Sequence, residues 1–376
     1  MTPHFRTGRA TGVALAVAMM MFPMQSAAAD VSLPNLIKRV QPSIVTVVGY
    51  DDTGESVQLG TGFFVDRRGH LVTNRHVLAG AVRAEVKGKS GRVYPIVEVL
   101  AEDPDGDLIK VLVDIPFTRV RPLRLSQKAP APGEKVVVIG SPYGLEQTVS
   151  DGIVSTLREV DTIGSILQIT APISRGSSGS PVLDGRGQVI GIATVQVADA
   201  QNLNFAIPSA RAIALKVERG RSFEEWAADT HMGAGLSAAA SGEFEASRAL
   251  YEQAIRLRPD SVESHDGLGM ALHALGLYDE ALESYENALR IDPSFVQSHF
   301  HVGELYERFE QPSKALESYE KVLRLRPDHA SAHRNAALVA MRLGDRVDAM
   351  RRHAELRGID RRLAEKLLLE LEECCS

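Results

Sequence analysis

Residues 228–329 repeat with a period of 34 residues, and this period constrains the fold more than any other feature of the chain. A glycine, a tyrosine and a proline recur at fixed places in each period: Gly235, Gly269 and Gly303; Tyr251, Tyr285 and Tyr319; Pro259, Pro293 and Pro327. Alanine, leucine and glutamate dominate between them at helical spacing. A glycine on one helix lets a second helix approach closely, the aromatic ring fills the gap, and proline ends the second helix. The period therefore predicts a stack of helix pairs.

These units resemble tetratricopeptide repeats, which predicts an all-α solenoid over residues 228–376. The three repeats are expected at 228–261, 262–295 and 296–329. A degenerate fourth unit begins at Ala330 and has His353 where tyrosine belongs. The segment Arg361–Glu373 is predicted to form a capping helix, because the last repeat of a stack otherwise leaves its apolar face uncovered.

Residues 30–219 have the pattern of an all-β domain. Short runs rich in valine and isoleucine alternate with glycine, proline and aspartate at intervals of about ten residues, which favours a barrel or sandwich. A short helix is expected at Leu33–Val40, and the proline-containing segment Thr118–Gly133 is expected to separate two halves. The strands are expected at Ser43–Val48, Gly62–Val65, Tyr94–Leu100, Leu108–Val113, Lys135–Ile139, Gly152–Leu157, Ile166–Ile169, Pro181–Leu183, Gln188–Val195 and Asn204–Ile207.

Residues 1–29 are predicted to be a secretory signal peptide. Arg6 and Arg9 precede the apolar run Val13–Phe22, and three alanines before Asp30 fit a cleavage site. The run is too short to span a bilayer comfortably, so a soluble mature protein is expected, with an uncleaved membrane anchor as the alternative. We expect contact with a membrane only through this segment, and a periplasmic or secreted location.

Cysteine content and charge limit the cellular compartment and the classes of partner that we expect. The only cysteines are the adjacent Cys374 and Cys375, so the domains have no internal disulfide framework, which suits a bacterial periplasm; an intermolecular bridge stays open. Residues 227–376 carry 18 basic and 26 acidic side chains, a balance of −8, and the two arginines of the signal-like segment bring the net charge of the chain to −6. A chain without a basic excess is not expected to bind nucleic acid.

A Gly-flanked serine in the β domain indicates nucleophilic catalysis. A serine hydroxyl needs a base to take its proton and a third group to orient that base. His76, Asp107 and Ser178 occur in the chain order of chymotrypsin-like proteases. Ser178 is preferred to its neighbours Ser177 and Ser180, because Gly176 precedes it by two residues and Gly179 follows it.

The acid of this set has two competitors in the same loop. Asp103 and Asp105 are expected to be turn residues. Asp107 directly precedes the hydrophobic run Leu108–Val113, where the orienting acid is expected.

Residues Leu33–Ser209 resemble the protease domain of the HtrA/Deg family. The motifs that carry this resemblance are Gly60-Thr61-Gly62-Phe63, Thr73-Asn74-Arg75-His76-Val77, Asp107-Leu108, Gly140-Ser141-Pro142-Tyr143-Gly144, Gln147-Thr148-Val149-Ser150-Asp151-Gly152-Ile153-Val154-Ser155, Gly176-Ser177-Ser178-Gly179 and Asn204-Phe205-Ala206-Ile207-Pro208. The resemblance implies two six-stranded β-barrels with Ser178 as nucleophile, His76 as base and Asp107 as its orienting acid. It also implies an oxyanion hole formed by the backbone N–H groups of Gly176 and Ser178.

The chain departs from this family pattern in several places. Ser177 stands for the usual asparagine and Ser180 for a glycine, and both changes can weaken activity because they lie in the nucleophile turn. Lys110 interrupts an apolar strand, so its side chain is expected to point to solvent, or the local register to differ. The helical repeats stand where a PDZ domain usually follows.

Specificity is expected to favour small or medium aliphatic residues. Trypsin-like enzymes that bind basic side chains have an acid six residues before the nucleophile, and here that residue is Pro172. Ile173 resembles the residue at the floor of the pocket, and Val195 is expected beside it. The strand Ile192–Val195 is expected to pair with an extended substrate.

The concave face of the repeats is expected to be mixed and acidic, which favours a hydrophobic or basic peptide or another subunit as its partner. Its predicted positions are Glu263, Asp266, Met270, His273, Gln297, Phe300, Glu304 and Glu307. A spacer or oligomerisation element, including a homo-oligomer, is the alternative.

The sequence as a whole predicts a periplasmic serine endopeptidase for extended or unfolded proteins, with repeats that recruit substrate or partner. The alternative is a weak or inactive protease-fold scaffold whose repeats carry the function. No cofactor or metal is expected, because the histidines show neither His-Glu-x-x-His spacing nor a Cys/His cluster.

Overall fold

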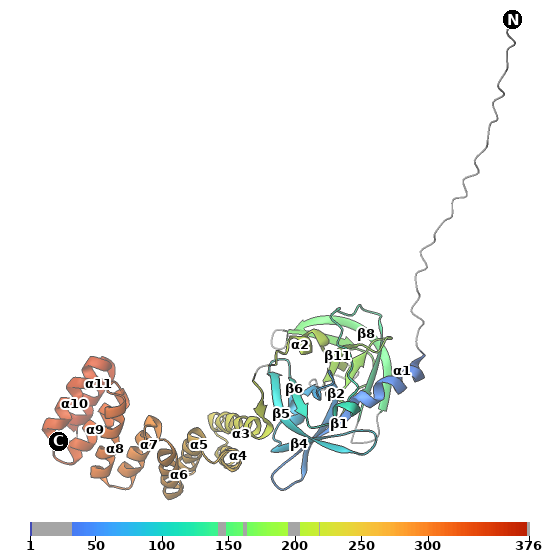
Figure 1. Cartoon of the computed structure of the whole chain (residues 1–376). Coiled ribbons are helices and arrows are strands. Elements are labelled where there is room, and N and C mark those ends of the chain that lie inside the picture. The colour runs from blue at the N-terminus through green and yellow to red at the C-terminus, as the bar shows by residue number, and fades with distance from the viewer. Residues whose placement is uncertain (2–31, 142–147, 161–163, 195–203, 218, 374–376) are drawn as a thin grey trace.

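The computed structural model describes Met1 and residues 32–141, 148–160, 164–194, 204–217 and 219–373. The predicted signal segment after Met1, Val195 and the two cysteines therefore lie outside the described residues. Figure 1 shows a β-rich body from which a long helical array extends, with α3 and α4 nearest to the body. No helix in the described ranges is long and apolar enough to cross a membrane.

The first half of the body is a closed barrel of six strands. Its sheet runs in the order β5-β4-β1-β2-β3-β6, and pairing of β5 with β6 closes the ring. Helix α1 (Leu33–Val40) and the 3₁₀ turn η1 (Gln41–Ser43) precede it, and the turn η2 (Arg75–Leu78) follows β3. The strands are β1 (Ile44–Tyr50), β2 (Ser56–Phe64), β3 (His70–Asn74), β4 (Arg83–Lys87), β5 (Val93–Asp103) and β6 (Leu108–Val113).

The second half is another closed six-stranded barrel, in the order β10-β11-β12-β9-β8-β7. The short turn η3 (Phe117–Arg119) lies in the connection between the barrels, and helix α2 (Ser209–Ala214) follows the last strand. The strands are β7 (Lys135–Gly140), β8 (Thr148–Val160), β9 (Gly164–Ile169), β10 (Pro181–Leu183), β11 (Val189–Thr194) and β12 (Asn204–Pro208).

A buried cluster between the barrels fixes one against the other. Phe63, Val72 and Leu108 of the first barrel pack there with Ile139 and Ile192 of the second. Helix α1 adds its buried apolar face to the same cluster. Because protein interiors are close-packed, this shared core holds residues of the two barrels in a defined relative position.

The double barrel predicted from sequence is confirmed. Helix α1 and strands β6 and β10 have the bounds expected, and the connection between the barrels contains the predicted seam Thr118–Gly133. Strands β3 and β4 were not among the expected strands. In β4 the buried Ala84 and Val86 alternate with charged side chains, so the run is too polar to stand out.

The repeat region is a run of nine helices from α3 to α11 within the described residues. Consecutive helices contact one another along the array. Helix α11 has the bounds predicted for the capping helix, and Leu367 and Leu371 on it are buried against α9 and α10. The helices are α3 (Phe223–Ala240), α4 (Phe244–Leu257), α5 (Val262–Ala274), α6 (Tyr278–Ile291), α7 (Val296–Arg308), α8 (Pro312–Leu325), α9 (Ala330–Arg342), α10 (Arg346–Ile359) and α11 (Arg361–Glu373).

The repeated glycine and tyrosine pack against each other as predicted. A Cβ atom placed on Gly269 of α5 would lie 2.5 Å from Cε1 of Tyr285 on α6, and one on Gly303 would lie 2.5 Å from the same atom of Tyr319. Both tyrosines are fully buried. Two helices of one repeat can approach this closely only where the first has no side chain.

Replacing Gly269 with alanine is therefore expected to destabilise the array by about 1–3 kcal/mol, because the added methyl overpacks the ring. Gly233 of α3 is the matched control, since its Cβ would meet nothing within 4 Å. There alanine should stabilise by up to about 1 kcal/mol through helix propensity. Urea unfolding followed by circular dichroism measures both, and equal effects would contradict this packing.

A second repeated contact was not predicted. The Nε2–H groups of His265, His299 and His333 donate to the carbonyl oxygens of Pro259, Pro293 and Pro327, at 3.0, 2.9 and 2.8 Å respectively. Each bond ties the start of one repeat to the end of the previous one. The 34-residue spacing of these histidines was visible in the sequence and could have revealed it.

The expectation of a free acidic concave face was wrong for several of its residues. Asp266 is buried and accepts a hydrogen bond from Ser298 Oγ at 2.7 Å, and burial raises its pKa. Glu307 accepts from the Tyr319 hydroxyl at 2.6 Å, and Phe300 lies against the ring of Tyr319. These side chains join neighbouring helices, because the inner positions of a tight stack are largely used by the stack itself.

Candidate active site

His76 and Asp107 meet at the end of a strand pair in the first barrel. β3 and β6 are antiparallel, with Asn74 opposite Leu108, so the residue after β3 and the residue before β6 are neighbours. His76 Nδ1 lies 2.6 Å from Asp107 Oδ2, and the backbone N–H of His76 donates to Oδ1 at 2.9 Å. A carboxylate at Nδ1 favours the tautomer with its proton there, which leaves Nε2 able to accept another proton.

Asp107 has an unusual backbone conformation that directs its carboxylate toward His76. Its φ is 51°, in the left-handed region that aspartate tolerates better than most residues. Its carbonyl oxygen accepts hydrogen bonds from the Arg75 backbone N–H and from Asn74 Nδ2, both at 3.0 Å. The η2 turn therefore binds both the carbonyl oxygen and the carboxylate of Asp107, and Asn74 at the end of β3 adds a third hydrogen bond.

The other two acids of this loop do not reach His76. Asp103 pairs with Arg211 of α2, accepting from Nε at 2.8 Å, and also accepts the Gly106 N–H at 2.9 Å. Asp105 is exposed. The structure thus brings only Asp107, of the three candidates, to the imidazole.

Ser178 lies in a tight turn of the second barrel and is 6% exposed. Gly179 has a φ of +83°, and a Cβ there would lie 2.0 Å from the carbonyl oxygen of Thr61. No side chain fits that space, so glycine is required after the serine. The turn also presses against the first barrel, which carries Thr61.

Three of the five backbone N–H groups from Gly176 to Ser180 have an acceptor among the described residues. Those of Ser177, Gly179 and Ser180 donate to Ser174, Ala193 and Ser177 carbonyls at 2.9 Å each. Within the described residues, the N–H groups of Gly176 and Ser178 have no protein acceptor. Two unpaired donors two residues apart match the donor set predicted for an oxyanion hole.

Thr61 on β2 joins the nucleophile turn to the first barrel, a role that the sequence analysis missed. Its N–H donates to the Ser178 carbonyl at 2.8 Å, and its hydroxyl donates to the Gly176 carbonyl at 2.9 Å. The same hydroxyl accepts the Ser141 N–H at 3.0 Å. The Gly-Thr-Gly motif around it was the signal in the sequence, although the motif alone gave no role.

Gly60, the residue before Thr61, marks where the two halves of the site meet. A Cβ on Gly60 would lie 2.5 Å from Val77 Cγ1 and 3.1 Å from the Ser178 carbonyl oxygen. The turn that carries His76 and the turn that carries Ser178 therefore converge on this strand. The site is thus composed from both barrels.

Thr61→Val is expected to destabilise the protease domain by about 1–3 kcal/mol, because the valine leaves the buried Gly176 carbonyl and Ser141 N–H without partners. Urea unfolding measures this change. Thr46→Val, at a half-buried position on β1, is the control and should stay within about 0.5 kcal/mol of the parent. A Thr61→Val protein as stable as the control would contradict the bridging role.

The two serine departures have different surroundings. Ser177 Oγ accepts a weak hydrogen bond from the Ser174 N–H at 3.4 Å. Ser180 is fully buried, and its hydroxyl has no partner among the described residues. A Cβ on Gly140 would lie 2.3 Å from that hydroxyl, so Gly140 makes room for it. That these serines weaken activity stays a prediction.

The predicted pocket residues are placed only in part. Ile173 is partly buried and packs against the core of the second barrel. Pro172 is exposed, and its carbonyl accepts from Ser150 Oγ at 2.8 Å. Val195 lies outside the described residues.

The prediction that Ile192–Val195 pairs with substrate was wrong at Ile192 and stays a prediction at Thr194. Ile192 is paired with Pro181 on one side and with Ile207 on the other, and Thr194 is paired with Phe205. The strand therefore has no free edge at Ile192, whereas Thr194 is paired with another strand on one side only within the described residues.

The expectation that Lys110 points to solvent was also wrong. The strand register is regular against β3, but against β5 it shifts between Val99 and Ala101, next to Lys110, as the alternative expectation allowed. Lys110 is half-buried and its Nζ donates to the Leu215 carbonyl at the end of α2, at 2.8 Å. Burial lowers the pKa of the amine. The lysine therefore helps to dock α2 on the first barrel.

The comparisons with known proteins define the class of each half. Residues 60–192 match the trypsin-like peptidase domain, and residues 232–294 and 303–355 match the tetratricopeptide repeat. The chain thus consists of a trypsin-like peptidase domain followed by tetratricopeptide repeats. The relatives of the peptidase domain include proteins named HtrA serine proteases.

Serine protease HTRA1A of Danio rerio is 34% identical over 192 residues, which are 47% of this chain and 39% of that protein. Putative serine protease HhoB of Synechocystis is 38% identical over 156 residues, which are 40% of this chain and 37% of that one. The chain thus matches about two fifths of the length of these relatives. The solved HtrA-type protease AlgW with tripeptide is 29% identical with a TM-score of 0.44, over 48% of this chain and 61% of that one.

Proposed function

We propose that the chain is an extracytoplasmic serine endopeptidase that cleaves extended or unfolded protein segments. The observation that carries the proposal is the Asp107 carboxylate, which engages both the backbone N–H and Nδ1 of His76. Ser178 supplies a hydroxyl in a Gly-flanked turn that converges on the same strand, beside two N–H donors that have no acceptor in the described part of the chain. The relatives named serine proteases support the same activity.

In this proposal Ser178 Oγ attacks the scissile carbonyl carbon while His76 Nε2 accepts the hydroxyl proton. The N–H groups of Gly176 and Ser178 donate to the oxyanion of the tetrahedral intermediate. The C–N bond then breaks, and the imidazolium gives its proton to the departing amine, which leaves an acyl-enzyme. Water then attacks the acyl carbon while His76 Nε2 accepts its proton. The C–Oγ bond breaks, His76 returns the proton to Ser178 Oγ, and the carboxylic acid product leaves.

The proposed specificity is for small or medium aliphatic residues such as Val, Ala or Ile before the cut. Its support is Ile173, an apolar side chain five residues before Ser178, and the absence of an acid at Pro172. A series of peptides that differ only in that residue tests it. Faster cleavage after Lys or Arg would overturn this part of the proposal.

A fluorophosphonate probe tests the activity directly, because it reacts with an activated serine and forms a stable adduct. Labelling of the wild type that disappears in Ser178→Ala supports the peptidase. A folded wild type that stays unlabelled supports the alternative, a scaffold without turnover. Casein should be cut faster than a stably folded protein of similar size, and equal rates would contradict the preference for unfolded segments.

The repeats are proposed to bind a protein partner or substrate, as stacked helix pairs commonly do. Pull-down of casein by Ser178→Ala, with and without competing basic peptide, tests substrate recruitment, and sedimentation analysis tests self-association. The signal-like sequence supports export to the periplasm or medium. N-terminal sequencing of the exported protein should then begin at Asp30, whereas an uncleaved N-terminus would contradict signal removal.

A further inference from the structure

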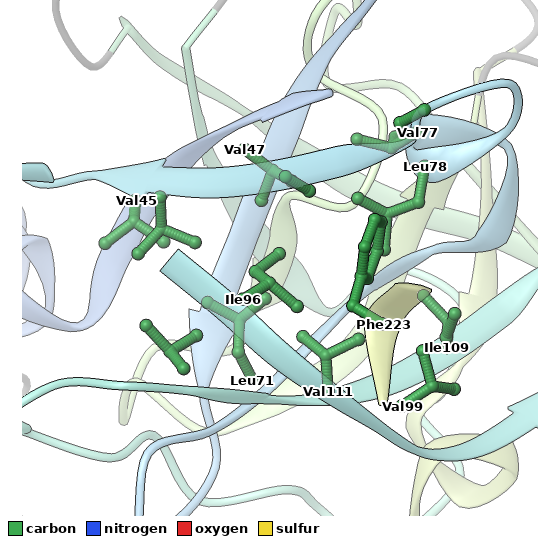
Figure 2. Packing of buried hydrophobic residues seen from close by; sticks show 14 of the residues in the cluster. Val45, Val47, Leu71, Val77, Leu78, Ile96, Val99, Ile109, Val111 and Phe223 are labelled. Atoms are coloured by element: carbon green, nitrogen blue, oxygen red, sulfur yellow. The ribbon is translucent and has the colours of Figure 1, made fainter. Parts of the chain in front are cut away.

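The first helix of the repeat array is built into the core of the first barrel. Phe223, Trp226 and Ala227 on α3 are 4%, 1% and 0% exposed and belong to the same buried cluster as Leu71 and Ile109 of the barrel. Figure 2 shows Phe223 among the valines and isoleucines of that cluster. The helix therefore closes the barrel core as well as beginning the array.

A short strand directly precedes this helix and pairs with the first barrel. Arg221 and Ser222 form the short strand β13, which pairs with Val99 and Glu98 of β5. Ser222 then caps α3, accepting the Glu225 N–H at 3.0 Å while the Glu225 carboxylate accepts the Ser222 N–H at 2.9 Å. A paired strand followed by a capped helix fixes the direction in which the array leaves the barrel.

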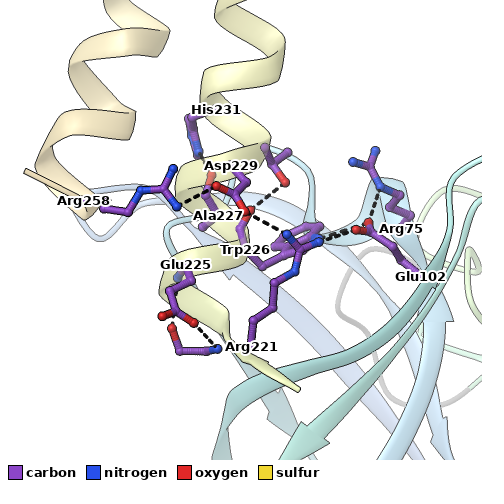
Figure 3. A network of polar contacts seen from close by, with 11 residues as sticks. Arg75, Glu102, Arg221, Glu225, Trp226, Ala227, Asp229, His231 and Arg258 are labelled. Atoms are coloured by element: carbon purple, nitrogen blue, oxygen red, sulfur yellow. Dashed lines mark hydrogen bonds and ion pairs between the residues drawn. The ribbon is translucent and has the colours of Figure 1, made fainter. Parts of the chain in front are cut away.

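Glu102, at the end of β5, connects this junction to the candidate active site. Its Oε2 accepts from Arg75 Nε at 2.9 Å and from the Trp226 indole N–H at 3.1 Å, and its Oε1 accepts from Arg221. Figure 3 shows the carboxylate between the arginine of the η2 turn and the side chains of the junction. One carboxylate thus joins the catalytic turn to the repeats.

Arg75 carries the connection to the catalytic pair. It directly precedes His76, and its backbone N–H donates to the Asp107 carbonyl at 3.0 Å. Its guanidinium also lies 5.9 Å from the centre of the Trp226 ring. A fixed Arg75 side chain therefore restrains the η2 turn, which carries His76. Through the Arg75 N–H it also restrains Asp107, which contacts the His76 ring.

The charge state of Glu102 suits this role. Burial raises the pKa of the carboxyl, but hydrogen bonds from Arg75 and Trp226 and the nearby guanidinium groups outweigh burial and hold it below the usual value. The group is therefore ionised at neutral pH and binds both arginines as a carboxylate.

The network extends into the second helix of the array. Asp229 on α3 accepts from Arg221 Nη1 at 2.8 Å and from Arg258 Nη1 at 2.9 Å, and Arg258 is the residue after α4. A movement of the first helix pair therefore acts on the same arginine that Glu102 holds.

We propose that Glu102 is a positioning residue for the His76–Asp107 pair, and that through it α3 couples the repeat array to catalysis. The predicted effect on turnover rests on the proposed peptidase activity. The predicted effect on the position of His76 and Asp107 rests on the observed contacts alone. A ligand that changes the packing of α3 against α4 would then alter turnover without touching the candidate active site.

The test compares Glu102→Gln and Trp226→Phe with Glu98→Gln, a control on the same strand. Glutamine keeps the size of Glu102 but loses the charge, and phenylalanine keeps an aromatic ring but loses the indole N–H. Both test variants should lower kcat for a peptide substrate by about tenfold with KM nearly unchanged, and the control should stay within about twofold. Circular dichroism melting of each variant shows whether it is folded.

A second measurement does not depend on turnover. The Nδ1–H proton of His76 gives a low-field NMR signal, which is identified by its loss in Asp107→Asn. Glu102→Gln and Trp226→Phe should shift or broaden it, and Glu98→Gln should not. If the signal and kcat of both folded test variants equal those of the control, the positioning role is overturned. If the wild type shows no turnover but the signal still changes in Glu102→Gln and Trp226→Phe, the positioning role is supported and the proposed peptidase activity is refuted.

Discussion

Replacing Ser178 with alanine is expected to lower kcat by about a millionfold, the size of the loss when a nucleophilic serine is removed from a hydrolytic triad. The structure gives no other serine the same place. Ser177 and Ser180 share the turn, but the Ser180 hydroxyl is enclosed beside Gly140 and Ser177 Oγ contacts the Ser174 N–H. Single-turnover cleavage of a fluorogenic peptide measures the change.

Asp107→Asn should lower kcat by about ten-thousandfold under the same conditions, because an amide in place of the carboxylate favours the wrong tautomer of His76. Asp105→Asn is the matched control in the same loop, since Asp105 is exposed, and it should leave kcat within about twofold. If Asp105→Asn proved as damaging as Asp107→Asn, the assignment of the acid would be wrong.

Trp226→Ala is expected to destabilise the protease half by about 3–5 kcal/mol, although sequence alone places residue 226 beside the helical repeats. The ring is 1% exposed within the barrel cluster, and its N–H donates to Glu102. Removing it leaves a cavity and one less partner for that carboxylate. The midpoint of urea unfolding, followed by circular dichroism, measures the loss.

Leu236→Ala on the same helix is the control for this prediction. Leu236 is 59% exposed, so its truncation should change stability by no more than about 0.5 kcal/mol. Trp226 is also the chain's only tryptophan, so the wild-type fluorescence reports on this junction alone. Equal midpoints for the two variants would show that α3 does not complete the barrel core.

These predictions concern two parts of the molecule, the candidate triad and the α3 junction, which the sequence revealed to different degrees. His76, Asp107 and Ser178 stood out because each is embedded in a local motif, and the glycines around Ser178 meet a local steric demand. Glu102 and Trp226 belong to no motif, and their contact spans 124 positions of the chain. A pairing of that separation leaves no pattern in a single sequence.

The errors have the same origin. Lys110 was expected in solvent because a charged side chain interrupts an apolar strand, yet the end of α2 supplies a carbonyl for it. Asp266 was expected on an open groove because of its helical position, yet Ser298 of the next repeat covers it. In both cases a residue distant in the sequence forms a hydrogen bond with a polar group that was expected to be exposed to solvent.

The order of residues along the chain was enough to determine the stacked helix pairs, through their period, and the two β-barrels, through the resemblance of several motifs to a protease family. It also supplied the candidate triad as a prediction, because period, glycine placement and motif spacing are local properties. Only the folded molecule decided that Thr61 holds the nucleophile turn, that β11 has no free edge at Ile192, and that α3 completes a barrel. The physical reason is that burial and hydrogen bonding between elements depend on which surfaces meet in space. A local sequence pattern shows which face of an element is apolar or polar, but not which other element packs against it.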